Sequence, residues 1–143
     1  MFLDDLYQKI LLDHYQHPRH FRELTDQEAS VVVENPACGD RLRLRFVLEG
    51  ERITTLEAHC EGCAICTAST SMMAESLTGK TRAEANHKIQ GLLDLIETGA
   101  GIGDEELGDL KVFEGVQAYP GRKTCATLAW KALKDWLEKG KED

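Results

Sequence analysis

Cysteines and one aspartate are the side chains of this chain that are best suited to metal or sulfur chemistry. They are Cys38, Asp40, Cys60, Cys63, Cys66 and Cys125. The three central cysteines form a C-x2-C-x2-C pattern, a spacing that lets several thiolates converge on one metal ion or cluster. A ferredoxin run would continue with a fourth cysteine and a proline, but Thr67 and a serine-containing segment follow here. The pattern therefore indicates metal or sulfur chemistry without completing a ferredoxin motif.

An odd number of cysteines makes a disulfide framework a poor explanation for them. The chain has five, and its start, Met-Phe-Leu-Asp-Asp, lacks the basic segment and apolar run of a secretory signal. We therefore expect a cytoplasmic protein whose thiols are reduced. For any single position, the alternative is that a buried cysteine serves only as a small hydrophobic residue.

Length and charge narrow the class of protein further. A chain of 143 residues has the length of one ordinary domain, so we expect a single domain over residues 1–143. The composition, 42% hydrophobic and 29% charged, is typical of globular proteins. A formal net charge of -8 disfavours nucleic acids and anionic membranes as partners, because both would repel the chain. We expect neither kind of partner.

A small sheet is predicted in the first half of the chain. Residues 30–34 form a short β-branched segment, and charged and apolar side chains alternate over residues 41–47. A second such strand over residues 52–58 follows a tight glycine turn, which indicates an antiparallel hairpin. The segment between the first two strands is rich in turn formers, so we expect Cys38 and Asp40 on a loop.

Apolar residues recur at helical spacing in four other segments. These are residues 3–15, 63–77, 81–99 and 123–137. The third is bounded by a capping-box pattern of Thr81 with Glu84 and by Gly99, whereas the glycine-rich acidic residues 99–111 are expected to form a mobile connection. The order of one helix, three strands and several helices predicts an α+β fold, a three-stranded antiparallel sheet with helices on one face.

The predicted helices place two cysteines where a thiolate is favoured. Cys63 and Cys125 fall in predicted first turns, and the positive end of a helix stabilises a thiolate there. These two are therefore better placed as ligands or nucleophiles than Cys66, which we expect one turn deeper against the core. The five histidines show no ligand spacing with the cysteines, and surface or capping roles are expected for them.

Several segments resemble the U-type iron–sulfur scaffold family, which includes IscU, SufU and the N-terminal domain of NifU. They are Leu6–Tyr7, Asp13–Tyr15, His17–Arg19, Asn35–Asp40, Gly62–Cys63, Ala68–Met73 and Thr124–Ala126. The resemblance spans nearly the whole chain and implies the SufE/NifU fold. It also implies a metal site formed by Cys38, Asp40, Cys63 and Cys125, which in the family holds zinc or a nascent [2Fe–2S] cluster. This donor set suits either metal, and the weaker carboxylate ligand would make the site labile.

Within that family the sequence is most similar to the SufU branch. The IscU branch carries a histidine before the third cysteine, together with a Leu-Pro-Pro-Val-Lys segment, and here Thr124 precedes Cys125 and the segment is missing. The SufU resemblance implies a zinc-binding sulfur acceptor, an accessory sulfurtransferase rather than an independent enzyme. Cys38 is then expected to accept persulfide sulfur from a cysteine desulfurase of the SufS or IscS type. Downstream Suf components or apo iron–sulfur proteins are the expected recipients.

The alternative function is a scaffold that assembles a [2Fe–2S] cluster and transfers it to apo-proteins. Its expected cluster ligands are Cys38, Cys63 and Cys125. Most family members have no cysteine at positions 60 and 66, and either cysteine could replace Asp40. Cys60 is the better candidate, because position 60 ends a predicted strand near the site whereas position 66 is expected to point to the core. A structural zinc domain and an electron carrier are more remote readings. Arg122 resembles an arginine of the SufU branch and would either pair with Asp40 or lie on the surface.

Overall fold

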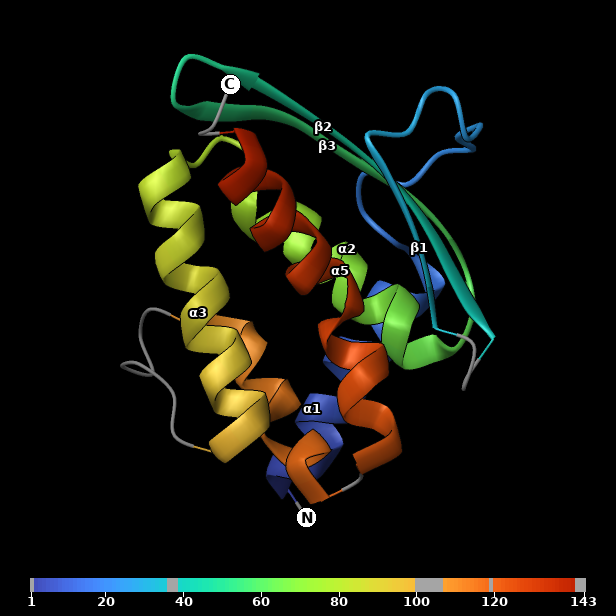
Figure 1. The fold of residues 1–143 in the computed structure, drawn as a ribbon. Helices are drawn as coiled ribbons and strands as arrows, with labels where there is room; N and C mark the ends of the chain where they lie inside the picture. Colours follow the sequence, from blue (N-terminus) through green and yellow to red (C-terminus); the bar gives the residue numbers. More distant parts are fainter. Residues whose placement is uncertain (1, 36–38, 100–106, 119, 141–143) are drawn as a thin grey trace.

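The fold is described from a computed structural model that covers all residues except 1, 36–38, 100–106, 119 and 141–143 (Figure 1). The elements in chain order are α1 (Phe2–Gln16), β1 (Val31–Asn35), β2 (Asp40–Glu49), β3 (Arg52–Glu61), α2 (Ala64–Leu77), α3 (Arg82–Thr98), the 3-10 helix η1 (Gly108–Ala118) and α5 (Pro120–Gly140). The sheet has the order β1-β2-β3 and is antiparallel throughout. The predicted α+β fold with a three-stranded antiparallel sheet is confirmed.

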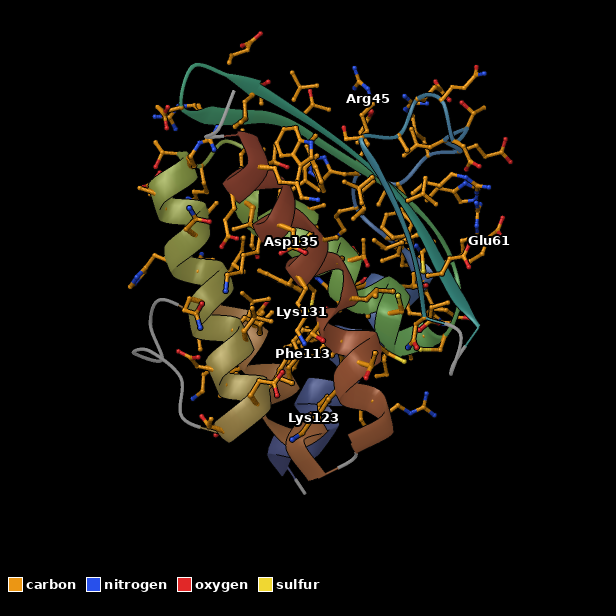
Figure 2. The ribbon with its side chains drawn as sticks, in the orientation of Figure 1. Arg45, Glu61, Phe113, Lys123, Lys131 and Asp135 are labelled. Carbon is orange, nitrogen blue, oxygen red and sulfur yellow. The ribbon has the colours of Figure 1, made fainter. Side chains whose placement is uncertain are left out.

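The helices pack on one face of the sheet, as expected (Figure 1). In β2 the residues that face the helices alternate with three arginines because successive side chains of a strand point to opposite faces. Leu42 and Leu44 are fully buried on the inner face, whereas Arg45 on the outer face forms an ion pair with Glu57 at 3.0 Å. Figure 2 shows Arg45 and Glu61 directed away from the helices and Phe113 among them.

The strand pairing places Asp40 on this inner face. Asn35 pairs with Asp40 at the end of the β1–β2 hairpin, so Asp40 is the first residue of β2. The expectation that Asp40 lies on the loop was therefore wrong. The loop is shorter than the turn-forming residues had suggested, because the β1–β2 strand pairing already includes Asp40. Cys38, the other residue expected on this loop, lies outside the described residues.

Helix α2 is the centre of the fold and has almost no solvent-exposed face. It packs against β3, α1 and α5, and the side chains from Cys66 to Ala74 are all buried. Its small residues let neighbouring segments approach closely. The Ser69 hydroxyl donates to the Ala126 carbonyl at 2.5 Å and accepts from Trp130 Nε1 at 2.9 Å, which fixes α5 against α2.

The helix at the N-terminus is joined to α2 by a buried polar contact that the sequence did not reveal. His14 is 3% exposed, and its Nδ1 lies 2.8 Å from the Ser71 hydroxyl, which also accepts from the Arg19 amide. Burial, with the charge of Arg19, lowers the pKa of His14 below its usual value. The expectation of a surface or capping role was therefore wrong for His14.

The C-terminal half contains one correction and one addition to the predicted helices. The capping box of Thr81 with Glu84 and the left-handed Gly99 cap of α3 are confirmed. Helix α5 begins at Pro120, three residues earlier than expected, since proline is tolerated in a first helical turn; Cys125 consequently lies in the second turn. The segment expected as a connection, residues 99–111, overlaps the start of η1 at residues 108–111, and residues 100–106 lie outside the described part. No helix among the described residues has the length and apolar character needed to span a bilayer.

Candidate metal site

Three of the expected site residues meet where β2, α2 and α5 converge. Asp40 begins β2, Cys63 caps the N-terminus of α2, and Cys125 projects from α5. One ligand atom from each of these residues lies within 4.8 Å of the other two. Asp40 and Cys125 are 2% and 1% exposed, whereas Cys63 is half-buried. The three side chains thus form a compact and largely buried group.

Asp40 is held by the loop that precedes α2. Its Oδ1 atom accepts a hydrogen bond from the Cys63 amide at 2.9 Å. Gly62 lies directly against the carboxylate, since a Cβ atom there would collide with Asp40 Oδ1 and would come within 3.1 Å of Asp40 Cα. A residue without a side chain is therefore required at position 62 for this approach.

The second carboxylate oxygen of Asp40 is the most informative atom of the site. Oδ2 is buried and has no hydrogen-bond partner among the described residues. An unpartnered carboxylate oxygen in the protein interior is unfavourable unless a cation or a donor satisfies it. With two thiols beside it, this oxygen completes a donor set of two sulfurs and one oxygen, which suits zinc or iron. The residues present therefore fit a bound metal ion.

Cys63 is oriented by the helix that it caps. Its backbone is extended, and its sulfur accepts a hydrogen bond from the Cys66 amide at 3.4 Å, so it acts as the N-cap of α2. Unpaired amides and the helix dipole favour negative charge at this position. Cys63 therefore lies at the start of its helix, as predicted. Cys125 lies one turn further along its helix than predicted.

Cys125 lies in the hydrophobic core, with polar groups close to its sulfur. Its sulfur lies 3.8 Å from the Gly121 carbonyl, to which the thiol can donate, and 4.0 Å from Asn35 Nδ2. Asn35 is 5% exposed and ends β1. Sequence reasoning treated Asn35 only as a turn residue, although its place in the Asn35–Asp40 motif was the available signal. The Asn35 amide therefore lies within hydrogen-bond reach of the Cys125 sulfur.

The remaining cysteines form a separate pair. The sulfurs of Cys60 in β3 and Cys66 in α2 lie 3.6 Å apart, and the Thr67 hydroxyl donates to Cys60 at 3.5 Å. The hydrogen bond with Cys66 lowers the pKa of the Cys60 thiol, whereas that same contact and burial raise the pKa of the Cys66 thiol. The structure thus gives Cys60 partners other than the group of Asp40, Cys63 and Cys125. Cys66 is fully buried, as expected.

Arg122 does not pair with Asp40 in this structure. Its side chain is exposed near the start of α5, and Asp40 Oδ1 is occupied by the Cys63 amide while Oδ2 has no partner within the described part of the chain. Of the two expectations for Arg122, the surface position is the one observed.

Comparison with known proteins identifies the family. The family model described as "NifU-like N terminal domain" matches residues 6–126 of this chain. The chain is 38% identical to the zinc-dependent sulfurtransferase SufU of Bacillus subtilis, over 96% of this chain and 92% of the relative. It is 34% identical to the iron–sulfur cluster assembly scaffold protein IscU of Streptococcus pyogenes, over 96% of this chain and 86% of the relative.

A solved structure agrees with the architecture. The N-terminal part of a nitrogen-fixing NifU-like protein from Brucella abortus superposes with a TM-score of 0.84 at 22% identity, covering 100% of this chain and 99% of that one. This similarity supports the fold alone. Together with the family match over most of its length, it shows that the chain belongs to the family of NifU-like N-terminal domains.

Proposed function

We propose that this protein is a zinc-binding sulfur acceptor of iron–sulfur cluster assembly, which takes persulfide sulfur from a cysteine desulfurase. The observation that carries the proposal is the group of Asp40, Cys63 and Cys125 with its unpartnered buried carboxylate oxygen. The similarity to a zinc-dependent sulfurtransferase over nearly the whole chain supports the same function.

The proposed zinc ligands are Cys38, Asp40, Cys63 and Cys125. Three thiolates and one carboxylate make a four-coordinate set of the kind that zinc accepts. When bound, zinc would hold the thiolates deprotonated and limit their oxidation. The chain contributes the orientation of these groups, through the Cys63 amide on Asp40 and through Asn35 beside Cys125.

Cys38 is the proposed sulfur acceptor. Cys125 is 1% exposed, and Cys63 is held by an amide of α2, so neither is well placed to meet the active cysteine of another protein. The Cys38 thiolate would attack the outer sulfur of the desulfurase persulfide. The S–S bond breaks, the desulfurase cysteine leaves as a thiolate, and Cys38 then carries the persulfide.

The proposed partners follow from this exchange. The donor is a cysteine desulfurase of the SufS or IscS type, and downstream Suf components or apo iron–sulfur proteins receive the sulfur. The main alternative is assembly of a [2Fe–2S] cluster on Cys38, Cys63 and Cys125, which the IscU relative supports. Thr124 in place of the histidine expected in the IscU branch favours sulfur transfer.

Desulfurase turnover tests the proposal. Zinc-loaded wild type is expected to stimulate alanine formation by a SufS-type desulfurase in the presence of a thiol reductant, and Cys38→Ser is expected to abolish the stimulation. Cys60→Ala is the matched control and should stimulate like wild type. Equal stimulation by wild type and Cys38→Ser would reject Cys38 as acceptor. No stimulation, with a [2Fe–2S] spectrum after anaerobic reconstitution, would instead support the scaffold function.

A further inference from the structure

Cys60 and Cys66 form a close thiol pair beside the candidate metal site. Their sulfurs are 3.6 Å apart, which is hydrogen-bond distance for two thiols. Cys60 pairs across the sheet with the fully buried Leu42, and cross-strand partners share a face, so the Cys60 side chain points toward α2. The proximity therefore follows from how β3 packs on α2 and not from the C-x2-C-x2-C spacing alone.

The two thiols differ in access and in hydrogen bonding. Cys60 is half-buried, whereas Cys66 is 0% exposed. The Cys60 sulfur also accepts a hydrogen bond from the Thr67 hydroxyl at 3.5 Å, which favours a thiolate on Cys60. An accessible nucleophilic thiol with a buried partner in contact is the arrangement of an attacking and a resolving cysteine.

A disulfide between them requires only a small movement. The S–S bond is about 2.0 Å long, so the two sulfurs must approach each other by roughly 1.6 Å. The closed loop would run from Cys60 to Cys66 and would contain Cys63. Because the Cys66 amide already donates to Cys63, this pair lies directly against the candidate metal site.

We propose that Cys60 and Cys66 are a dithiol that reduces persulfide sulfur to sulfide. The proposal rests on the proposed function, in which sulfane sulfur reaches the chain on Cys38. In the first step the Cys60 thiolate attacks the outer sulfur of a persulfide, whose parent thiolate leaves. In the second step Cys66 attacks Sγ of the Cys60 persulfide, a Cys60–Cys66 disulfide forms, and hydrosulfide leaves with the proton of Cys66.

This sequence of steps is balanced without a further reductant. The sulfane sulfur gains two electrons, and the two thiols together lose two electrons as they become a disulfide. One chain therefore releases one sulfide, after which its disulfide must be reduced for another round. Sulfide is the form of sulfur in an iron–sulfur cluster, and it would be released next to the proposed cluster or zinc ligands.

The test uses reduced, zinc-loaded full-length protein under anaerobic conditions with two sulfur donors. One donor is inorganic tetrasulfide, and the other is a desulfurase persulfide freed of excess cysteine by desalting. The control is the double variant Cys60→Ala/Cys66→Ala, which retains every proposed metal ligand. Sulfide is quantified, and peptides are analysed by mass spectrometry after the free thiols are alkylated. Zinc content equal to that of wild type verifies that each variant is folded.

Wild type is expected to release about one sulfide per chain more than the double variant releases, and to contain a Cys60–Cys66 disulfide afterwards. The single variant Cys66→Ala should instead retain a persulfide on Cys60 and release at least about tenfold less sulfide, because its resolving thiol is missing. Equal sulfide from wild type and double variant, with no Cys60–Cys66 disulfide from tetrasulfide, would overturn the proposal. If the desulfurase persulfide fails to transfer sulfur to Cys38, the proposed function is contradicted. The tetrasulfide experiment would still show whether Cys60 and Cys66 reduce sulfane sulfur.

Discussion

The two groups of cysteines in this protein lie side by side, but they differ in whether their polar atoms have hydrogen-bond partners. The group of Asp40, Cys63 and Cys125 contains a buried carboxylate oxygen that no described residue satisfies. In the pair of Cys60 and Cys66, each sulfur has the other as a partner. The first group therefore has the chemistry of a cation site, whereas the second has that of a dithiol. Adjacent cysteines of one sequence motif can thus serve different chemistry because a strand and a helix direct them differently.

The largest expected difference between the two groups is in zinc affinity. Cys125→Ser removes a proposed ligand, and we expect the affinity for zinc to fall by more than about 100-fold. This loss is larger than the loss typical of mutating a group that only hydrogen-bonds to a metal ligand. Cys66→Ala is the matched control and should keep one zinc per chain with wild-type affinity. Competition with a chromophoric chelator measures both. Equal losses in the two variants would remove the distinction between the groups.

Gly62→Ala tests the close approach of the loop to Asp40. The added Cβ would collide with Asp40 Oδ1, so the carboxylate must move. We expect zinc affinity to fall by about 10- to 100-fold, as for other changes that misorient a ligand. Gly115→Ala is the control, because a Cβ at Gly115 meets nothing within 4 Å. Unchanged affinity in Gly62→Ala would show that Asp40 is not held as described.

Asp40→Asn tests how the unpartnered Asp40 oxygen affects the stability of the metal-free protein and how it contributes to zinc binding. An amide can still accept from the Cys63 amide through its oxygen but carries no negative charge. We expect the metal-free variant to be more stable than metal-free wild type by about 1–3 kcal/mol, and zinc to add less stability to it. Urea unfolding with and without zinc measures both effects. A metal-free variant that is less stable than wild type would contradict the assignment of Oδ2 as an unsatisfied atom.

The smallest expected effect concerns the thiol pair itself. Because the hydrogen bond with Cys66 lowers the pKa of Cys60, loss of that donor in Cys66→Ala should raise it. Less of Cys60 is then a thiolate at neutral pH, and alkylation by iodoacetamide at pH 7 should be several-fold slower. Peptide mass spectrometry over a pH series measures the rate at Cys60. Thr67→Val should show the same direction with a smaller change, and an accelerated Cys60 would contradict the described contacts.

Much of this architecture could be predicted from the sequence, because its signals are local. Alternation identified β2, and the capping box of Thr81 with Glu84 identified the start of α3. The 3-10 helix η1 was missed because its first residues, 108–111, belong to the glycine-rich acidic segment, whose composition is typical of a connection. The start of α5 was placed too late because Pro120 reads as a break, although proline fits a first helical turn.

The candidate site was predictable only in part. Motif resemblance identified Asp40, Cys63 and Cys125 as partners, although they are far apart in sequence. The role of Asn35 beside Cys125 and the pairing of Cys60 with Cys66 depend on how β1 and β3 pack against the helices, which no local pattern reports. His14 was misjudged for the same reason, since its partner Ser71 lies 57 residues away.

The composition of the zinc shell tests the separation of the two groups most directly. X-ray absorption at the zinc edge of wild-type protein loaded with one zinc counts the ligand atoms and gives their distances. We expect three sulfurs at about 2.3 Å and one oxygen at about 2.0–2.2 Å. A shell of four sulfurs with no oxygen would contradict it, because Cys60 or Cys66 would then have replaced Asp40.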